Sequence, residues 1–194
     1  MTRLPSSFTV AQSIADNKAS VIYHCLQRMF KYGTSVLHNI NDEYIFQFNK
    51  IYKKAANEAH FYIEILRFNE NANGFLTARI EPDNNIIYMI IDHFNDRLHC
   101  ENFLIYDVRR NIAYIHMNNN TAFFYNDYNN ELLKQLDDFS DNENDIQNLW
   151  IRFYNTIAIK ERVNYKCQIN MLPLKYRKYL PELPIKKGIP PNNN

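Results

Sequence analysis

The chain has 194 residues, of which 46% are hydrophobic and 14% aromatic, and it contains only three glycines. This composition excludes a disordered chain and a collagen-like or glycine-linker architecture. The 22 basic and 21 acidic side chains give a net charge of only +1. A chain of this length suits one domain with a substantial core.

The apolar runs indicate where the protein is located, and the cysteines indicate its redox chemistry. No apolar run approaches the ~20 residues that span a bilayer, and the N-terminus lacks the pattern of a signal peptide. We therefore expect a cytoplasmic protein without membrane contact. The three cysteines, Cys25, Cys100 and Cys167, are scattered, so neither a disulfide framework nor a thiolate metal cluster is expected. The sequence predicts no cofactor and no metal site.

Two helices are predicted first along the chain. Apolar residues at helical spacing predict a helix over 20–32, which Gly33 ends. Asp42 suits the N-cap of a second, longer helix. The apolar seam of this longer helix contains Ile45, Phe48, Tyr52, Ala55, Ala59, Tyr62 or Ile63, and Leu66. A separate polar strip on the same helix contains Asn57, His60, Glu64 and Arg67.

Strands dominate the middle of the chain. Alternation and β-forming residues predict a strand that ends at Glu81 and Pro82, then a hairpin, then a third strand-like run. A period of three to four residues predicts a helix over 84–99. The expected strands span 74–80, 103–108, 112–117 and 121–125.

The C-terminal third is predicted to be mainly helical. Helices are expected over 129–139 and 145–159, with Asp145 as the N-cap of the second. A short helix is expected to begin near Pro173. The second helix is expected to bury Ile146, Leu149, Trp150, Phe153 and Ile157. The sequence thus predicts an α+β fold, with helices packed on a small, mostly antiparallel sheet. The expected organisation is an N-terminal extension (1–19), a single domain (20–182) and an extended or disordered tail (183–194).

Charge is distributed unevenly along the C-terminal half. Residues 127–145 carry seven acidic side chains and one basic one, whereas residues 150–187 carry nine basic and two acidic ones. Aromatic and basic residues interleave in the basic segment, a pattern that suits stacking on bases and pairing with phosphates. The same pattern suits an amphipathic cover for the core, and the residues leave both open. The interleaved candidates are Arg162, Tyr165, Lys166, Lys175, Tyr176 and Arg177.

Six polar residues are candidates for a catalytic pocket, with a histidine as general base and arginines on a phosphate or carboxylate. His60 shares one helix face with Arg67, and His93 lies four residues before Arg97. Each pattern also suits ordinary charge pairing on a solvated face. The six candidates are His60, Arg67, Glu81, His93, Arg97 and Asp107.

Several common catalytic motifs are absent from the sequence. It has no GxxxxGK[ST] phosphate loop, no GxGxxG, no GxSxG and no HExxH. The zinc-deaminase signature, His-x-Glu followed by PCxxC, is missing as well. These absences disfavour the usual nucleotide-hydrolysing, dinucleotide-binding and zinc-dependent enzymes.

Five segments occur in an order and spacing that resemble a known bacterial family. They are EAHFYIEILRF (58–68), ARIEPDNNI (78–86), DHFNDRL (92–98), IYDVRRNIAYIH (105–116) and LWIRFYNTIAIKERVNYKCQINMLPLKYRKYLPE (149–182). The chain resembles the family described as "probable DNA metabolism proteins" over about residues 20–182. Members occur alone or fused to a uracil-DNA glycosylase domain, and their genes tend to accompany a radical S-adenosylmethionine protein assigned to DNA repair.

The resemblance implies a set of shared site residues and a set of partners. DNA and the radical S-adenosylmethionine protein are the implied partners. Arg110, Asn164 and Gln168 join the basic segment as implied nucleic-acid contacts. The family's pattern covers Glu58, His60, Arg67, Phe68, Glu81, Pro82, Asp83, His93, Phe94, Arg97, Asp107, Arg110, Trp150, Arg162, Asn164, Gln168 and Pro173.

Three functional hypotheses follow from these observations. The first is an accessory protein of DNA repair or modification that binds nucleic acid through its basic C-terminal segment and works with the radical enzyme. The second is an enzyme that acts on a nucleotide or nucleic acid with the six-residue pocket. The third is a protein–protein adaptor that makes no nucleic-acid contact.

Overall fold

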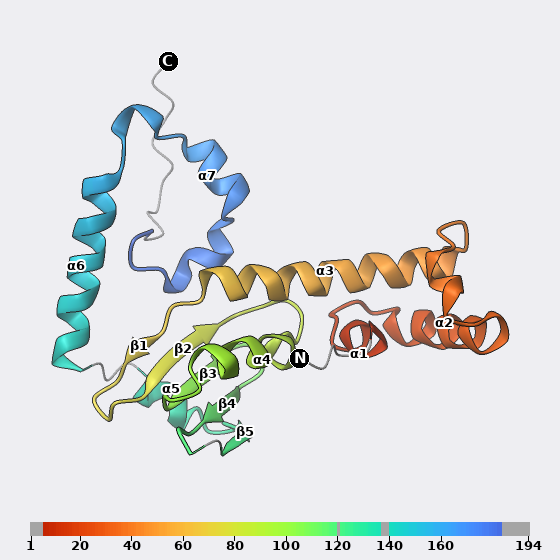
Figure 1. Cartoon of the computed structure of the whole chain (residues 1–194), viewed down its shortest axis with the longest axis horizontal. Helices are drawn as coiled ribbons and strands as arrows, with labels where there is room; N and C mark the ends of the chain where they lie inside the picture. The colour runs from red at the N-terminus through yellow and green to blue at the C-terminus, as the bar shows by residue number, and fades with distance from the viewer. Residues whose placement is uncertain (1–5, 120, 137–139, 184–194) are drawn as a thin grey trace.

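The computed structural model describes residues 6–119, 121–136 and 140–183 of the chain, which form helices and one five-stranded sheet (Figure 1). The helices are α1 (Ser6–Ala11), α2 (Lys18–Tyr32), η1 (Thr34–His38), α3 (Glu43–Ile65), α4 (Ile87–Arg97), α5 (Glu131–Gln135), α6 (Asp141–Ile157), η2 (Lys160–Arg162), α7 (Tyr165–Met171) and η3 (Leu174–Tyr179). The strands are β1 (Asn69–Glu70), β2 (Leu76–Ile80), β3 (Phe103–Asp107), β4 (Ile112–His116) and β5 (Ala122–Asn126). The α+β prediction is confirmed.

The five strands lie in sequence order, β1-β2-β3-β4-β5. β2 and β3 pair in parallel, and the other three pairs are antiparallel. The parallel pair arises because α4 connects β2 to β3, and parallel neighbours need such a crossover. The expected mostly antiparallel sheet is confirmed, although the two-residue strand β1 was not predicted.

Each face of the sheet packs against different helices. On one face, α3 and α4 bury Tyr62, Ile90 and Phe94 against Ile80 and Ile105 of the strands. On the other face, the short helix α5 covers part of the sheet, with Leu136 packed near Leu104 and Tyr106. In-register partners share a face, so Thr77 and Arg79, paired with Leu104 and Tyr106, lie on the α5 side.

A second core lies where α1, α2 and the first half of α3 pack together. Val10, Cys25 and Ile45 are fully buried in it, so part of the expected N-terminal extension packs on the helices. Asp42 caps α3 as predicted, accepting hydrogen bonds from Tyr44 N and Ile45 N at 3.0 and 3.3 Å. Arg28 also pairs with Asp42 and holds the pKa of that carboxyl below its usual range.

The segment 141–171, called here the arm, contains α6, η2 and α7 and rises from one end of the sheet (Figure 1). Its base is fixed by Glu143, which is buried and accepts a hydrogen bond from Glu70 N at 3.0 Å. Ser140, not Asp145, caps α6, and its hydroxyl accepts from Glu143 N at 3.2 Å. The helix therefore begins four residues earlier than predicted.

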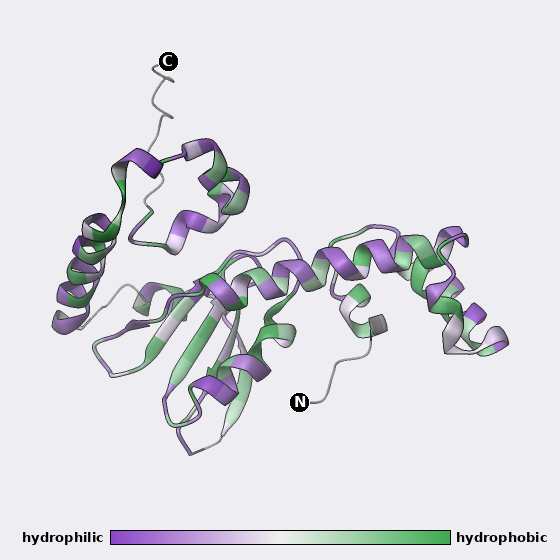
Figure 2. Cartoon of the chain, turned by 45° about the horizontal axis from the view of Figure 1, so that its top comes forward, coloured by the Kyte–Doolittle hydropathy of each residue, from purple (hydrophilic) through white to green (hydrophobic). Residues whose placement is uncertain are grey.

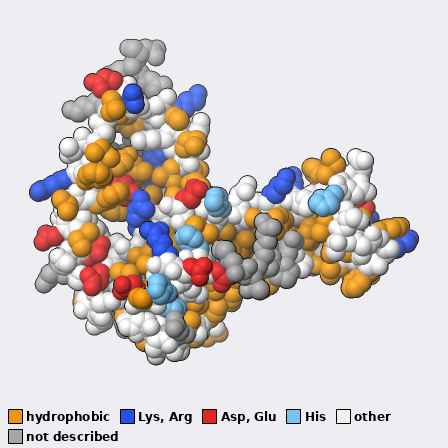
Figure 3. Space-filling view, viewed as in Figure 1, with side chains coloured by type: hydrophobic (Ala, Val, Ile, Leu, Met, Phe, Trp, Pro, Cys, Tyr) orange, Lys and Arg blue, Asp and Glu red, His pale blue; other side chains and the backbone are white. Residues whose placement is uncertain are grey.

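The predicted burial of the apolar side of α6 is wrong. Leu149 is 67% exposed, and hydrophobic residues recur along the length of α6 (Figure 2). Hydrophobic side chains gather on the upright part of the molecule that α6 and α7 form (Figure 3). Amphipathic spacing identifies an apolar side but does not guarantee a cover for it. The exposed side chains are Ile146, Leu149, Trp150, Phe153 and Ile157.

The other predicted helices agree with the structure to different extents. The helix expected over 84–99 is present as α4, although it begins at Ile87. Only Glu131–Gln135 of the helix expected over 129–139 is helical, and residues 137–139 lie outside the described part of the chain. Pro173 directly precedes η3, a 3-10 helix, and α7 was not predicted. Of the expected tail, only Leu183 is described.

Two observations bear on the membrane and on the thiols. No helix within the described residues is long and apolar enough to cross a membrane. Cys25 is buried, and its burial raises the pKa of the thiol. Cys100 and Cys167 are exposed free cysteines, the first between α4 and β3 and the second on α7.

Candidate functional site

The loop 81–84, which follows β2, is held by three distant parts of the chain. The first is Glu58 of α3, which is only 6% exposed. Its carboxylate accepts hydrogen bonds from Asp83 N and Asn84 N, both at 2.8 Å, and from Asn84 Nδ2 at 2.6 Å. Because charge-assisted hydrogen bonds are stronger than neutral ones, Glu58 fixes the loop on α3.

The second support is the turn between β3 and β4. Asp107 is fully buried, and its Oδ1 accepts from the backbone N–H groups of Arg109 and Arg110 at 3.0 and 3.2 Å. The Arg110 guanidinium donates to Asp107 Oδ2 at 2.8 Å, to Pro82 O at 3.2 Å and to Asp83 O at 2.6 Å. Burial raises the pKa of Asp107, and Arg110 opposes that rise.

The third support is η3, which brings basic residues to the loop. Lys175 Nζ donates to Asp83 Oδ2 at 2.7 Å, and Lys178 Nζ donates to Glu81 Oε2 at 2.5 Å. The bond from Lys175, together with that from Arg109, holds the pKa of Asp83 below its usual range. The bond to Glu81 raises the pKa of Lys178. Part of the basic C-terminal segment thus balances carboxylates of the chain itself.

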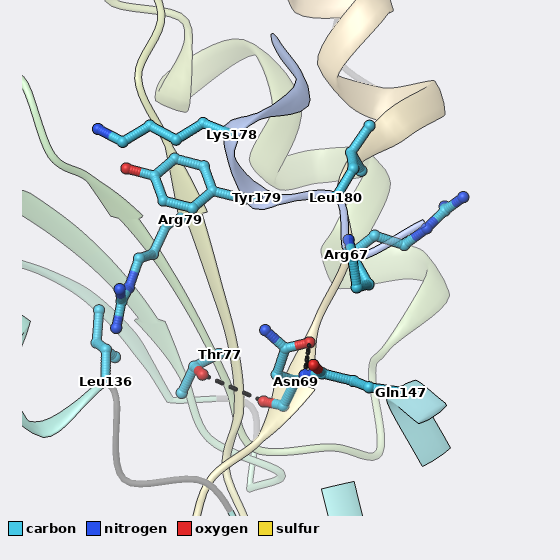
Figure 4. Close-up of a pocket in the computed structure, with 10 residues that line it drawn as sticks. Arg67, Asn69, Thr77, Arg79, Leu136, Gln147, Lys178, Tyr179 and Leu180 are labelled. Atoms are coloured by element: carbon cyan, nitrogen blue, oxygen red, sulfur yellow. Dashed lines mark hydrogen bonds between the residues drawn. The ribbon is translucent and has the colours of Figure 1, made fainter. Parts of the chain in front are cut away.

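An open groove of about 390 Å³ lies beside this network, between β1, β2, η3 and the base of α6 (Figure 4). Arg79 borders it from β2, and Asn69 Oδ1 accepts a hydrogen bond from Gln147 Nε2 at 3.2 Å. The guanidinium of Arg67 turns away from Arg79 in Figure 4 and pairs with Glu182 at 3.2 Å. It also lies 5.6 Å from the centre of the Trp150 ring.

The six catalytic candidates lie in different surroundings. His60 is exposed on α3 and pairs with Glu64 at 3.2 Å, while Asp107 is buried under Arg110. His93 contacts the ring of its neighbour Phe94, and Arg97 is exposed at the end of α4. Glu81 pairs with Lys178, and only Arg67 of the six lines the groove. Among the described residues, no three His, Cys, Asp or Glu side chains are placed to hold a metal ion.

The predicted nucleic-acid contacts divide into two groups. Arg162, Tyr165 and Lys166 are exposed on the arm, while Asn164 caps α7 by accepting from Cys167 N at 2.9 Å, and Gln168 is half-buried. Those in the body make internal contacts. Arg110 and Lys175 hold the loop 81–84, Tyr176 packs on Phe61 and Tyr62, and Arg177 is 8% exposed and donates to Leu172 O at 2.9 Å.

Sequence reasoning missed the groove residues Asn69, Arg79 and Gln147. One signal was present, because Thr77 and Arg79 alternate with Ala78 and Ile80 along β2 and so mark a polar side of the strand. Asn69 and Gln147 gave no comparable signal, since they belong to elements that meet only in the folded chain.

Together these features define an α+β protein whose loop 81–84 is clamped by charges from α3, the β3–β4 turn and η3, with the arm beside the sheet. The chain belongs to a family defined by a domain of unknown function (DUF4130), whose model matches residues 16–182. No curated protein and no solved structure matches the chain.

Proposed function

We propose that the protein is an accessory protein of DNA repair or modification that binds single-stranded nucleic acid along its arm. The observation that supports this proposal is the exposed cluster on the arm. Arg162 and Lys166 are exposed and make no ion pair with any described residue, and Tyr165 between them is 55% exposed. Lys175, Arg177 and Lys178 of the same segment, by contrast, donate hydrogen bonds to Asp83, Leu172 O and Glu81.

This cluster suits a single strand for two physical reasons. Lys and Arg pair with phosphates and release condensed counterions, so the binding should weaken steeply with salt. An exposed Tyr ring gives a base a stacking surface that does not depend on sequence. The single strand fits better than a duplex, because the bases of a duplex are already stacked on each other.

The test measures fluorescence anisotropy of labelled single-stranded, double-stranded and uracil-containing DNA at two salt concentrations. We expect salt-dependent binding, strongest for the single strands, that Arg162→Ala/Lys166→Ala abolishes. The matched control is Lys50→Ala/Lys53→Ala, which removes two exposed charges from α3. If the control weakens binding as much as the arm variant does, only net charge matters and the assignment to the arm is wrong.

The exposed apolar side of α6 favours a second candidate function, which is docking of a protein partner. Five large apolar side chains exposed along one helix form the kind of surface that usually marks an interaction site. The partner that we propose is the radical S-adenosylmethionine protein that the family resemblance implies. The test is a pull-down in which one purified protein, immobilised through a tag, captures the other from solution. We expect Leu149→Asp/Phe153→Asp to abolish it and Asn144→Asp/Asn155→Asp, on the polar side of α6, to leave it intact.

We do not propose the second hypothesis, an enzyme with a six-residue catalytic pocket. That hypothesis required one cleft to contain His60, Arg67, Glu81, His93, Arg97 and Asp107. Within the described chain, Glu81 and Asp107 serve as anchors of the loop 81–84, and His60 pairs with Glu64 on the exposed side of α3.

A further inference from the structure

A second cavity, of about 330 Å³, lies at the start of η3, whereas the groove lies at its end, and this cavity is bordered by α3, the loop 81–84 and the end of α7. Its volume falls in the range of about 300–1,000 Å³ that is usual for small-molecule sites. Polar side chains on two of its sides are exposed and make no hydrogen bond to any described residue. They are Lys54 and Asn57 of α3 and Asn170 of α7.

Aromatic rings form another wall of this cavity. Phe61 and Tyr176 lie 4.5 Å apart between ring centres, and both line the cavity. Primary amides can pair with the donors and acceptors at the edge of a nucleobase, and aromatic rings pack on its faces. The combination of two amides, one ammonium group and a ring wall therefore suits a base with its adjoining phosphate.

The cavity is held in shape by the network around the loop 81–84. Asp83 and Asn84, which line it, are fixed by Glu58, and Lys175 is fixed by Asp83. Tyr176 is held against Tyr62 of α3, with ring centres 5.4 Å apart. A site that is already in its binding geometry loses less conformational entropy when a ligand binds.

We propose that this cavity receives one unstacked nucleobase of a strand whose backbone lies on the arm. This inference rests on the proposed function, since it requires a strand bound along the arm. The helix α7 connects the two sites, because it runs from the exposed Tyr165 and Lys166 to Asn170 at the cavity. A strand that follows this helix presents its bases to Asn57, Asn170 and the Phe61–Tyr176 wall. The protein then recognises a base that has left its stack, while the arm holds phosphates.

The test compares two labelled strands of equal length, an oligodeoxyadenylate and a strand with abasic nucleotides throughout. The wild type is expected to bind the adenine strand more tightly. Asn57→Ala/Asn170→Ala should lower affinity for the adenine strand roughly tenfold, the effect of losing two hydrogen bonds, and leave the abasic strand unchanged. Both positions are exposed, so the variant should keep the wild-type urea unfolding curve. Asn148→Ala, at an exposed position on α6, should change neither affinity.

The outcomes separate this inference from the proposed function. An equal change for both strands in the double variant overturns the base pocket and leaves strand binding by the arm intact. Equal affinity of the wild type for the two strands overturns the base pocket and base stacking on Tyr165, and leaves only the pairing of Arg162 and Lys166 with phosphates. Arg162→Ala/Lys166→Ala should weaken both strands alike. If the wild type binds neither strand, the proposed function fails and the pocket fails with it.

Discussion

At the scale of single residues, the most informative side chain is Glu58. It lies on the buried side of α3, where Ala55, Ala59 and Tyr62 form the apolar seam, yet it is a carboxylate. Three N–H donors from the loop 81–84 satisfy it, which explains how a charge is tolerated at a buried position. Glu58 therefore acts as a structural anchor that places the loop.

Replacement of this anchor should be costly. Glu58→Gln keeps the size of the side chain but turns an amide NH₂ toward N–H donors, which leaves buried groups unpaired. We expect the free energy of unfolding to fall by about 2–3 kcal/mol in urea denaturation. Glu64→Gln, on the exposed side of the same helix, should change it by less than about 0.5 kcal/mol. Similar effects of the two substitutions would show that Glu58 is not an anchor.

Asp83 should make stability depend on acid pH. Its pKa is lowered by Lys175 and Arg109, so the folded state favours the ionised carboxylate. This contribution is present above the unfolded-state pKa and is lost as the pH falls through the folded-state pKa. Asp83→Asn should therefore cost up to about 1 kcal/mol near pH 7, since Asp83 is partly exposed. The gap between wild type and variant should narrow at an acid pH below the usual range of an aspartate pKa, because the folded-state pKa of Asp83 is lowered. Urea unfolding at both pH values measures it, and a gap that persists in acid would contradict it.

The residue scale also shows the limit of sequence patterns. Asp42 could be predicted as a cap because its partners lie two and three residues away. The pairs of Glu58 with Asp83 and of Asp83 with Lys175 join residues 25 and 92 positions apart. Only the fold brings such residues together, so the anchoring role of Glu58 could not be predicted.

At the scale of elements, α6 shows that helix formation and burial of the apolar side of a helix are separate properties. Its helical spacing correctly predicted a helix, because the period of apolar residues is a local property. The cover for its apolar side depends on what other elements leave free. Here η2 and α7 continue the arm, so the described chain leaves Leu149 and Phe153 in solvent.

Exposure of this side leads to a stability comparison between two leucines. Leu149→Ala should change the free energy of unfolding by less than about 0.5 kcal/mol, since a surface position loses little packing. Leu104→Ala, at a buried position of β3, should cost about 2–4 kcal/mol. Urea denaturation of the isolated protein gives both values. A cost for Leu149 close to that for Leu104 would mean that the apolar side of α6 is covered in solution.

At the scale of the whole molecule, α3 connects two cores. Its first half packs with α1 and α2, and its second half packs with α4 on the sheet. At about 1.5 Å per residue, its 23 residues extend over roughly 35 Å. The chain is one domain, but its packing is divided along this helix.

This division predicts that the N-terminal core opens separately. Ile45→Ala removes a buried side chain from the helical core, and Ile90→Ala removes one from the core on the sheet. Native-state hydrogen exchange should show that Ile45→Ala lowers protection of α2 amides while β3 amides keep theirs, because local opening follows local packing. Ile90→Ala should lower protection in β3. Equal loss in α2 and β3 for both variants would show that the two cores open as one unit.

Two of the three cysteines, Cys100 and Cys167, are exposed and can be labelled to measure the position of the arm. Cys25 is buried with a raised thiol pKa, so a maleimide should react first with Cys100 and Cys167. One of these lies on the body beside the sheet and the other on α7 of the arm. A donor and acceptor dye pair on the native thiols would therefore read the distance between body and arm directly. Energy transfer between the dyes would then report whether the arm swings when a strand or a protein partner is added, without any engineered cysteine.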